Sequence, residues 1–191
     1  MKKLSFVLFV ATILTFTCCD SLDIDPIIDN PVILDIKVNT TWETGKTYVI
    51  DGRLNIDGAI LTIEPGVIVK FKEGAQIEVG SSSTGSAIIA IGTVDQPILF
   101  TSNAAIPSAG DWDAIFFHSG TASTTLLTYC NFEYGGGYSA YSGIIDLDEA
   151  EISMENCTIK HSAAYGIVMD AQSKFKSFTN NAISNTVNHV I

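Results

Sequence analysis

An internal repeat in the C-terminal half constrains the fold of this chain more than any other feature of its sequence. Three six-residue segments align without gaps at spacings of 27 and 24 residues, namely 127–132, 154–159 and 178–183. In this alignment Phe132, Ile159 and Ile183 form one apolar column. A unit of this length with short strands and no helix is typical of one coil of a solenoid, in which equivalent residues of successive coils stack.

The rest of the chain from Trp42 onward consists of short strand-like runs separated by Gly, Asn, Asp and Ser. The runs alternate between apolar and polar residues and are rich in β-branched side chains. No segment of helical length shows a sustained 3.6-residue period with caps. We therefore predict an all-β parallel β-helix of about six coils, which would be roughly 30 Å long at a spacing of about 4.8 Å per coil.

The repeat also predicts which side chains face the core. Phe132, Ile159 and Ile183 should point inward as a ladder, and Cys130 and Cys157 should stack at a corner or inside the core. The sequence leaves two states for these cysteines, a disulfide and free thiols. An oxidising compartment permits the disulfide, but the sequence does not give the geometry that the bond requires.

The C-terminal residues repeat an ordinary coil segment at 181–186 and end part-way through the next unit. The open end of a β-helix exposes unpaired backbone groups and core side chains, which invites association. We therefore expect a β-helix that is incomplete at its C-terminus and a chain that self-associates at this open end.

The N-terminal residues are typical of an export signal. Lys2 and Lys3 precede an apolar run at 4–16 that is too short to span a bilayer comfortably. The sequence Phe-Thr-Cys-Cys that follows resembles the lipobox of bacterial lipoproteins. The resemblance implies lipidation of Cys19, with Cys18 as the alternative, and an ordinary cleaved signal peptide is the other interpretation.

These features divide the chain into a lipoprotein signal peptide at 1–18, an acidic tether with an N-terminal cap at 19–40, and a β-helix domain at 41–191. The formal charge is −11, and without residues 1–18 it becomes −13, from 8 basic and 21 acidic residues. Such an acidic surface repels nucleic acid and anionic lipid headgroups. We therefore expect no nucleic-acid partner, and attachment to a lipid bilayer of the cell envelope, at the outer membrane or cell surface, through the N-terminal lipid alone.

The segment 61–71, which reads Leu-Thr-Ile-Glu-Pro-Gly-Val-Ile-Val-Lys-Phe, resembles the opening coil of a bacterial family with the pectin-lyase-like β-helix. The segments 88–93, 97–102 and 110–117 follow in the order and spacing of that family. The resemblance covers residues 40–186 and implies a right-handed parallel β-helix. Members include surface lipoproteins and adhesin-like proteins, and polysaccharide lyases and hydrolases use the same fold, so the resemblance alone does not assign an activity.

Residues for catalysis are sparse. A calcium-dependent lyase needs clustered carboxylates and a base, and the chain has one arginine, Arg53. The candidate metal ligands are Asp146, Asp148 and Glu149, whose oxygen atoms suit Ca²⁺. No base lies near them in the sequence, and His118 is expected at the surface after a turn. We therefore assign no catalytic residue, no metal and no cofactor, and interpret the acidic group as a turn between coils.

Aromatic residues offer the best candidates for ligand contacts. Trp112 lies between two aspartates, and Tyr134, Tyr138 and Tyr141 surround a glycine run at 135–137. Aromatic rings beside polar groups suit sugars and protein surfaces. For Trp112 the alternative is packing in the core.

We predict from these observations a lipid-anchored envelope β-helix that binds a polysaccharide or a surface protein as a binding or adhesion module. The alternative is a polysaccharide lyase or hydrolase, or a fragment of one, and a structural spacer is the third interpretation. A basic residue that faces the acidic cluster across coils would favour the enzyme. An exposed aromatic row on one sheet would favour glycan binding, and a uniformly polar surface the spacer.

Overall fold

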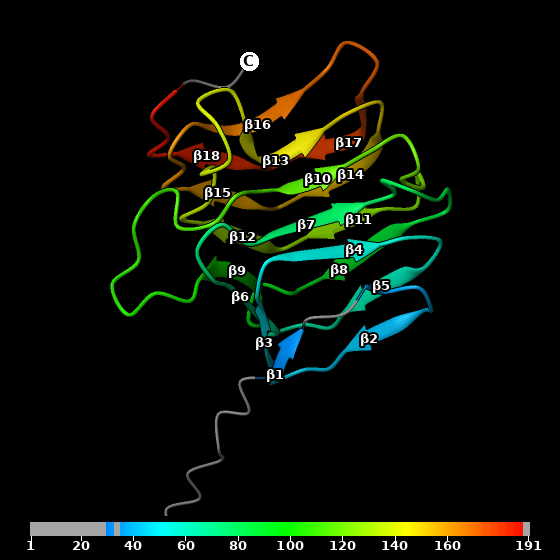
Figure 1. The fold of residues 1–191 in the computed structure, drawn as a ribbon, viewed down its shortest axis with the longest axis horizontal. Helices are drawn as coiled ribbons and strands as arrows, with labels where there is room; N and C mark the ends of the chain where they lie inside the picture. The colour runs from blue at the N-terminus through cyan, green and yellow to red at the C-terminus, as the bar shows by residue number, and fades with distance from the viewer. Residues whose placement is uncertain (1–29, 33–34, 189–191) are drawn as a thin grey trace, which may run out of the picture.

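The computed structural model describes residues 30–32 and 35–188, which form a parallel β-helix of three sheets (Figure 1). The predicted signal peptide, Cys18, Cys19 and most of the acidic tether lie outside the described residues. Within the described part of the chain, no helix has the length and apolar character that a membrane span requires.

Each complete coil contributes one strand to each sheet, so neighbours within a sheet lie one coil apart in the chain. Sheet A contains β1 (Asn30–Val32), β3 (Thr47–Ile50), β6 (Ile68–Phe71), β9 (Ile98–Ser102), β12 (Cys130–Glu133), β15 (Thr158–Lys160) and β18 (Ala182–Ser184). Sheet B contains β4 (Arg53–Ile56), β7 (Gln76–Val79), β10 (Ile115–Phe117), β13 (Gly143–Leu147) and β16 (Tyr165–Met169). Sheet C contains β2 (Thr40–Trp42), β5 (Ile60–Ile63), β8 (Ala87–Ile91), β11 (Leu126–Thr128), β14 (Glu151–Glu155) and β17 (Lys174–Thr179). The predicted right-handed parallel β-helix of about six coils is thereby confirmed.

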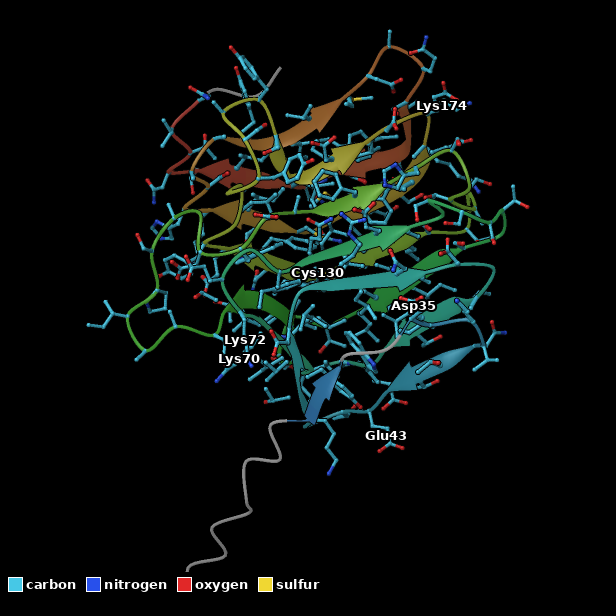
Figure 2. All side chains as sticks on the ribbon, in the orientation of Figure 1. Asp35, Glu43, Lys70, Lys72, Cys130 and Lys174 are labelled. Atoms are coloured by element: carbon cyan, nitrogen blue, oxygen red, sulfur yellow. The ribbon has the colours of Figure 1, made fainter. Side chains whose placement is uncertain are left out.

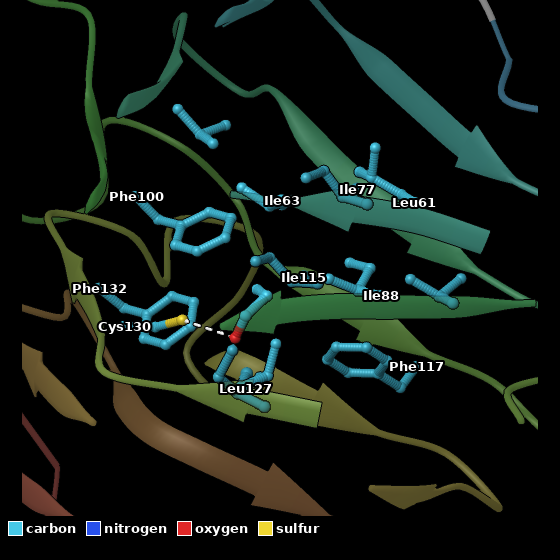
Figure 3. Close-up of a cluster of buried hydrophobic side chains, with 14 of the residues drawn as sticks. Leu61, Ile63, Ile77, Ile88, Phe100, Ile115, Phe117, Leu127, Cys130 and Phe132 are labelled. Carbon is cyan, nitrogen blue, oxygen red and sulfur yellow. Dashed lines mark hydrogen bonds between the residues drawn. The ribbon is translucent and has the colours of Figure 1, made fainter. Parts of the chain in front are cut away.

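The predicted core ladder is confirmed as well. Phe132 pairs in register with Phe100 of the preceding coil and with Ile159 of the next, and Ile159 pairs with Ile183. The rings of Phe100 and Phe132 stack with centroids 4.7 Å apart (Figure 3). Ile159 is buried and Ile183 half-buried, because Ile183 belongs to the last described coil.

A left-handed backbone conformation recurs at the corner between sheets C and A. Tyr129, Asn156 and Asn180 occupy this corner in successive coils with φ angles of 49°, 55° and 54°. Asparagine tolerates this conformation better than most residues, and Asn180 Nδ2 donates a hydrogen bond to Asn156 Oδ1 at 3.3 Å. The sequence repeat therefore reflects one sharp corner that is used three times.

Cys130 and Cys157 follow this corner and are buried free thiols. The backbone N–H of Cys130 donates to Cys157 Sγ at 3.4 Å, and the Cys130 thiol donates to the carbonyl of Ala90 at 3.6 Å (Figure 3). Burial raises the pKa of the Cys130 thiol well above its ordinary value. The two cysteines therefore pack in the core as the sequence repeat predicts.

Residues 30–32 and 35–42 contact all three sheets at the N-terminal end of the β-helix. β1 pairs with β3, Ile36 forms a bridge to Ile56, and β2 pairs with β5. Ile36 and Trp42 are buried. These described residues thus add one strand or bridge to each sheet before the first full coil.

Candidate functional site

The outer face of sheet B carries a column of chemically distinct side chains, one from each coil. The strand register pairs Asn55 with Glu78, Glu78 with Phe116, and Phe116 with Asp146. The neighbours of Phe116 within β10 are buried in the core, so the alternation of the strand directs Phe116 outward. Phe116 therefore lies between two carboxylates on the surface of the sheet.

Glu78 is 9% exposed although it lies on an outer face. Its carboxylate accepts a hydrogen bond from the side-chain amide of Gln76. It also lies 3.5 Å from Nε of Arg53 and 2.5 Å from Nε2 of His118. Burial of a carboxylate is costly unless such partners satisfy its oxygens. The four side chains therefore hold one another in a fixed arrangement.

His118 connects Glu78 to a second acidic pair. His118 Nδ1 lies 3.4 Å from Asp148 Oδ2. Desolvation raises the pKa of the neighbouring Asp146, and Asp148 adds to the rise, whereas a hydrogen bond from Gly143 and the proximity of His118 oppose it. The Asp146 carboxyl therefore keeps its proton to a higher pH than an ordinary aspartate does.

Tyr138 adds a second aromatic ring to this column. It belongs to the loop between β12 and β13, and its ring meets Phe116 edge-on, with centroids 5.2 Å apart and an interplanar angle of 78°. Tyr138 is 60% exposed, and Phe116 is half-buried. We name Arg53, Gln76, Glu78, Phe116, His118, Tyr138, Asp146 and Asp148 together the sheet B site.

The other two predicted tyrosines occupy different surroundings. Tyr134 is half-buried and stacks on His161, with ring centroids 5.1 Å apart. Tyr141 is 82% exposed on the same loop as Tyr138. Within the described residues, Tyr138 is thus the one predicted tyrosine whose ring packs against Phe116.

The expectation that Trp112 contacts a ligand is wrong, because its side chain is fully buried. Its ring stacks on Phe71 with centroids 4.1 Å apart, and its Nε1 donates to the carbonyl of Glu133 at 2.9 Å. Burial of a large aromatic ring stabilises the fold most when the ring N–H has a hydrogen-bond partner. A Cβ on Gly135 would come within 2.7 Å of this ring, so the glycine run at 135–137 allows the loop to pack on Trp112.

The candidate metal ligands do not form a joint site. Asp146 and Asp148 belong to the sheet B site, whereas the Glu149 backbone lies in a left-handed turn and donates to Asp170 Oδ1 at 3.1 Å. Across residues 30–32 and 35–188, no group of three or more His, Cys, Asp or Glu side chains is arranged to hold a metal ion.

Sequence reasoning missed Glu78 and Phe116 and placed His118 at an ordinary surface position. The signal that could have found them is their position in the strands. Glu78 and Phe116 both occupy outward-facing positions of the strand alternation, and Phe116 lies in register with Glu78 and with Asp146. The turns that separate these strands differ in length, so the register was not visible before the coils were stacked.

The comparisons agree with this architecture. A family model described as a pectate-lyase-like β-helix domain matches residues 34–152, a range that includes every residue of the sheet B site. No curated protein and no solved structure matches the chain.

Proposed function

The chain belongs to the family of pectate-lyase-like β-helix domains, and from this premise we propose that it binds a neutral glycan at the sheet B site. The family fits a carbohydrate-related module. The observation that carries the proposal is the partly exposed pair of Phe116 and Tyr138 beside Asp146 and Asp148. Aromatic rings take the apolar faces of sugar rings, and carboxylates accept hydrogen bonds from their hydroxyl groups.

Charge favours a neutral ligand over a polyuronate. The chain has a formal charge of −11. The sheet B site itself combines three carboxylates with Arg53 and His118, both of which already contact Glu78. An acidic polysaccharide would meet like charge at long range and no unpaired cation within the site, whereas a neutral glycan meets neither obstacle.

A glycan screen of the full chain tests this proposal. We expect binding to neutral glycans, and a loss of about fivefold in affinity for Phe116→Ala, because aromatic contacts contribute on the order of 1 kcal/mol each. The matched control is Tyr141→Ala, which removes an exposed tyrosine from the loop that carries Tyr138. This variant should bind as the unmodified chain does. Equal losses in the two variants, or binding confined to polyuronates, would contradict the proposal.

Cleavage of a polysaccharide is the second candidate, and His118 is the observation that favours it. A basic residue faces the acidic pair Asp146 and Asp148 across coils, and the raised pKa of Asp146 suits a proton donor. We nevertheless expect no turnover of pectate, alginate or neutral glycans, with or without Ca²⁺. Cleavage that disappears in Asp146→Asn but persists in Asp95→Asn would establish the enzyme instead.

We further propose that the module is an envelope lipoprotein attached through Cys19, where it acts in binding or adhesion. The support is the resemblance of residues 16–19 to a lipobox after an export signal. Expressed in a bacterium, the protein should incorporate a palmitate analogue. Cys19→Ala should abolish the label and Cys18→Ala should retain it, and the reverse pattern would move the anchor to Cys18.

A further inference from the structure

A polar cleft of about 580 Å³ lies at the corner between sheets A and B, apart from the sheet B site. Three successive turns form it. One contains Asp51, the next contains Lys72 and Glu73, and the third is the long segment from Ser102 to Asp111 (Lys72 is labelled in Figure 2). Its volume lies within the range of small-molecule sites.

The wall of the cleft is fixed by its own hydrogen bonds. Asp111 Oδ2 accepts hydrogen bonds from Ser102 Oγ at 2.5 Å and from the Ser108 backbone N–H at 2.9 Å. The Gly110 N–H donates to the carbonyl of Tyr134 in the next coil at 3.2 Å. The long segment is therefore held by hydrogen bonds within itself and to the next coil.

The lining suits a ligand that both donates and accepts hydrogen bonds. Lys72 Nζ and Asp51 Oδ2 form an ion pair at 2.6 Å and offset each other's charge. The cleft is also lined by the carboxylate of Glu73 and the amide of Asn103, which together offer acceptors and donors. A neutral polyhydroxyl ligand meets both needs, whereas an anionic one would lie beside Glu73.

The cleft lies next to the sheet B site along the chain. Asp51 precedes Arg53 by two residues, and Glu73 precedes Gln76 by three. The loop that carries Tyr138 leaves the same corner one coil after the segment that walls the cleft. Asp111 in the cleft wall precedes Phe116 by five residues, which span at most about 17 Å of extended chain, so one extended oligosaccharide can reach both places.

We propose that this cleft is a second sugar subsite, so that the ligand is an extended neutral oligosaccharide held at the cleft and at Phe116 together. This inference rests on the proposed glycan binding at the sheet B site. It predicts that affinity rises with chain length, because the second contact forms at a high effective concentration.

Calorimetric titration of the full chain with bioses and hexaoses of β-glucan, mannan and xylan tests the inference. We expect a hexaose to bind at least about tenfold more tightly than the biose of the same series. The double variant Glu73→Ala with Asn103→Ala should lower hexaose affinity to that of the biose and leave biose binding unchanged. Glu73→Gln, which keeps the shape of the side chain, should reproduce part of the loss. Glu43→Ala removes an exposed glutamate outside the cleft and should have no effect.

The outcomes separate the inference from the function on which it rests. A biose that binds as tightly as its hexaose, or a double variant that keeps the full gain with length, overturns the second subsite and leaves the sheet B site standing. A failure of every series to bind counts against both proposals.

Discussion

The imidazole of His118 contacts the carboxylate of Glu78, with Nε2 2.5 Å from Oε2, although the two residues lie 40 positions apart in the chain. β7 and β10 are neighbours in sheet B, so the stacking of coils alone creates this contact. Arg53 and Gln76 complete the surroundings of the Glu78 carboxylate.

Glu78→Ala should lower the free energy of unfolding by about 2 kcal/mol, because it leaves Gln76 and His118 without their shared acceptor. Arg53 is exposed enough for water to replace the lost contact, which limits the cost. Chemical denaturation measures the difference. Glu43→Ala, in an exposed glutamate, should stay within about 0.5 kcal/mol of the unmodified chain. If the two variants unfold alike, the Glu78 network is not stabilising.

The core ladder gives a sharper test of register. Ile159→Asp places an unpaired charge between Phe132 and Ile183 and should cost at least about 4 kcal/mol, enough to prevent folding. Lys160 is the adjacent residue and faces outward, where it pairs with Glu133 at 3.0 Å. Lys160→Gln should therefore cost no more than about 1 kcal/mol. Circular dichroism shows whether each variant folds. A folded Ile159→Asp protein would show that the strand register is incorrect.

The sequence predicted the ladder because three coils of similar length repeat the corner that contains Asn156 and Asn180. Direct alignment then places Phe132 beside Ile159 without knowledge of the earlier coils. The position of Glu78 beside Phe116 was not predictable in this way. The segment between β9 and β10 is much longer than the turn between β6 and β7, so the repeat cannot be aligned there from the sequence.

The exposure of aromatic residues also depended on tertiary packing. Trp112 and Tyr138 both lie in polar, glycine-rich surroundings in the sequence. Trp112 is buried because Phe71 of the preceding coil and Gly135 of the next one leave a flat space for its ring. Neither neighbour is near Trp112 in the chain, so its burial follows only from the stacked coils.

Asp146 should make stability depend on pH. Its folded-state pKa is raised above the ordinary value of 3.8, so its contribution to stability is present below that value and is lost as the pH rises through the raised pKa. Asp146→Asn replaces the carboxyl group by an amide that does not ionise, so the variant does not lose this stability as the pH rises. The variant should therefore match the unmodified chain near pH 3 and exceed it near pH 7, by less than about 1 kcal/mol since the group is partly exposed. Thermal unfolding of both proteins between pH 3 and pH 7 measures the sign of this difference in stability. The exposed control Asp95→Asn should show no such divergence, and a variant less stable at pH 7 would contradict the argument.

The last described coil presents core-type side chains at the surface. Phe178 pairs in register with the buried Met154 of the preceding coil, yet it is 45% exposed. Its ring packs against Phe175, with centroids 4.6 Å apart. Within the described residues, β16, β17 and β18 each pair on one side only. Within the part of the chain that the structure describes, this face therefore combines apolar rings with strand edges that have no partner.

We propose that the chain self-associates through this face, because apolar side chains beside open strand edges promote pairing with another chain. Light scattering of the full chain should give a mass above that of the monomer, and a hydrophobic dye should bind to the protein. Phe178→Ser should shift the population toward the monomer and reduce dye binding. Val94 is also an exposed apolar residue, at 75%, but it lies in an early coil, so Val94→Ser should leave association unchanged. A stable monomer of the unmodified chain without dye binding, or equal effects of the two serine variants, would exclude this face as the site of contact.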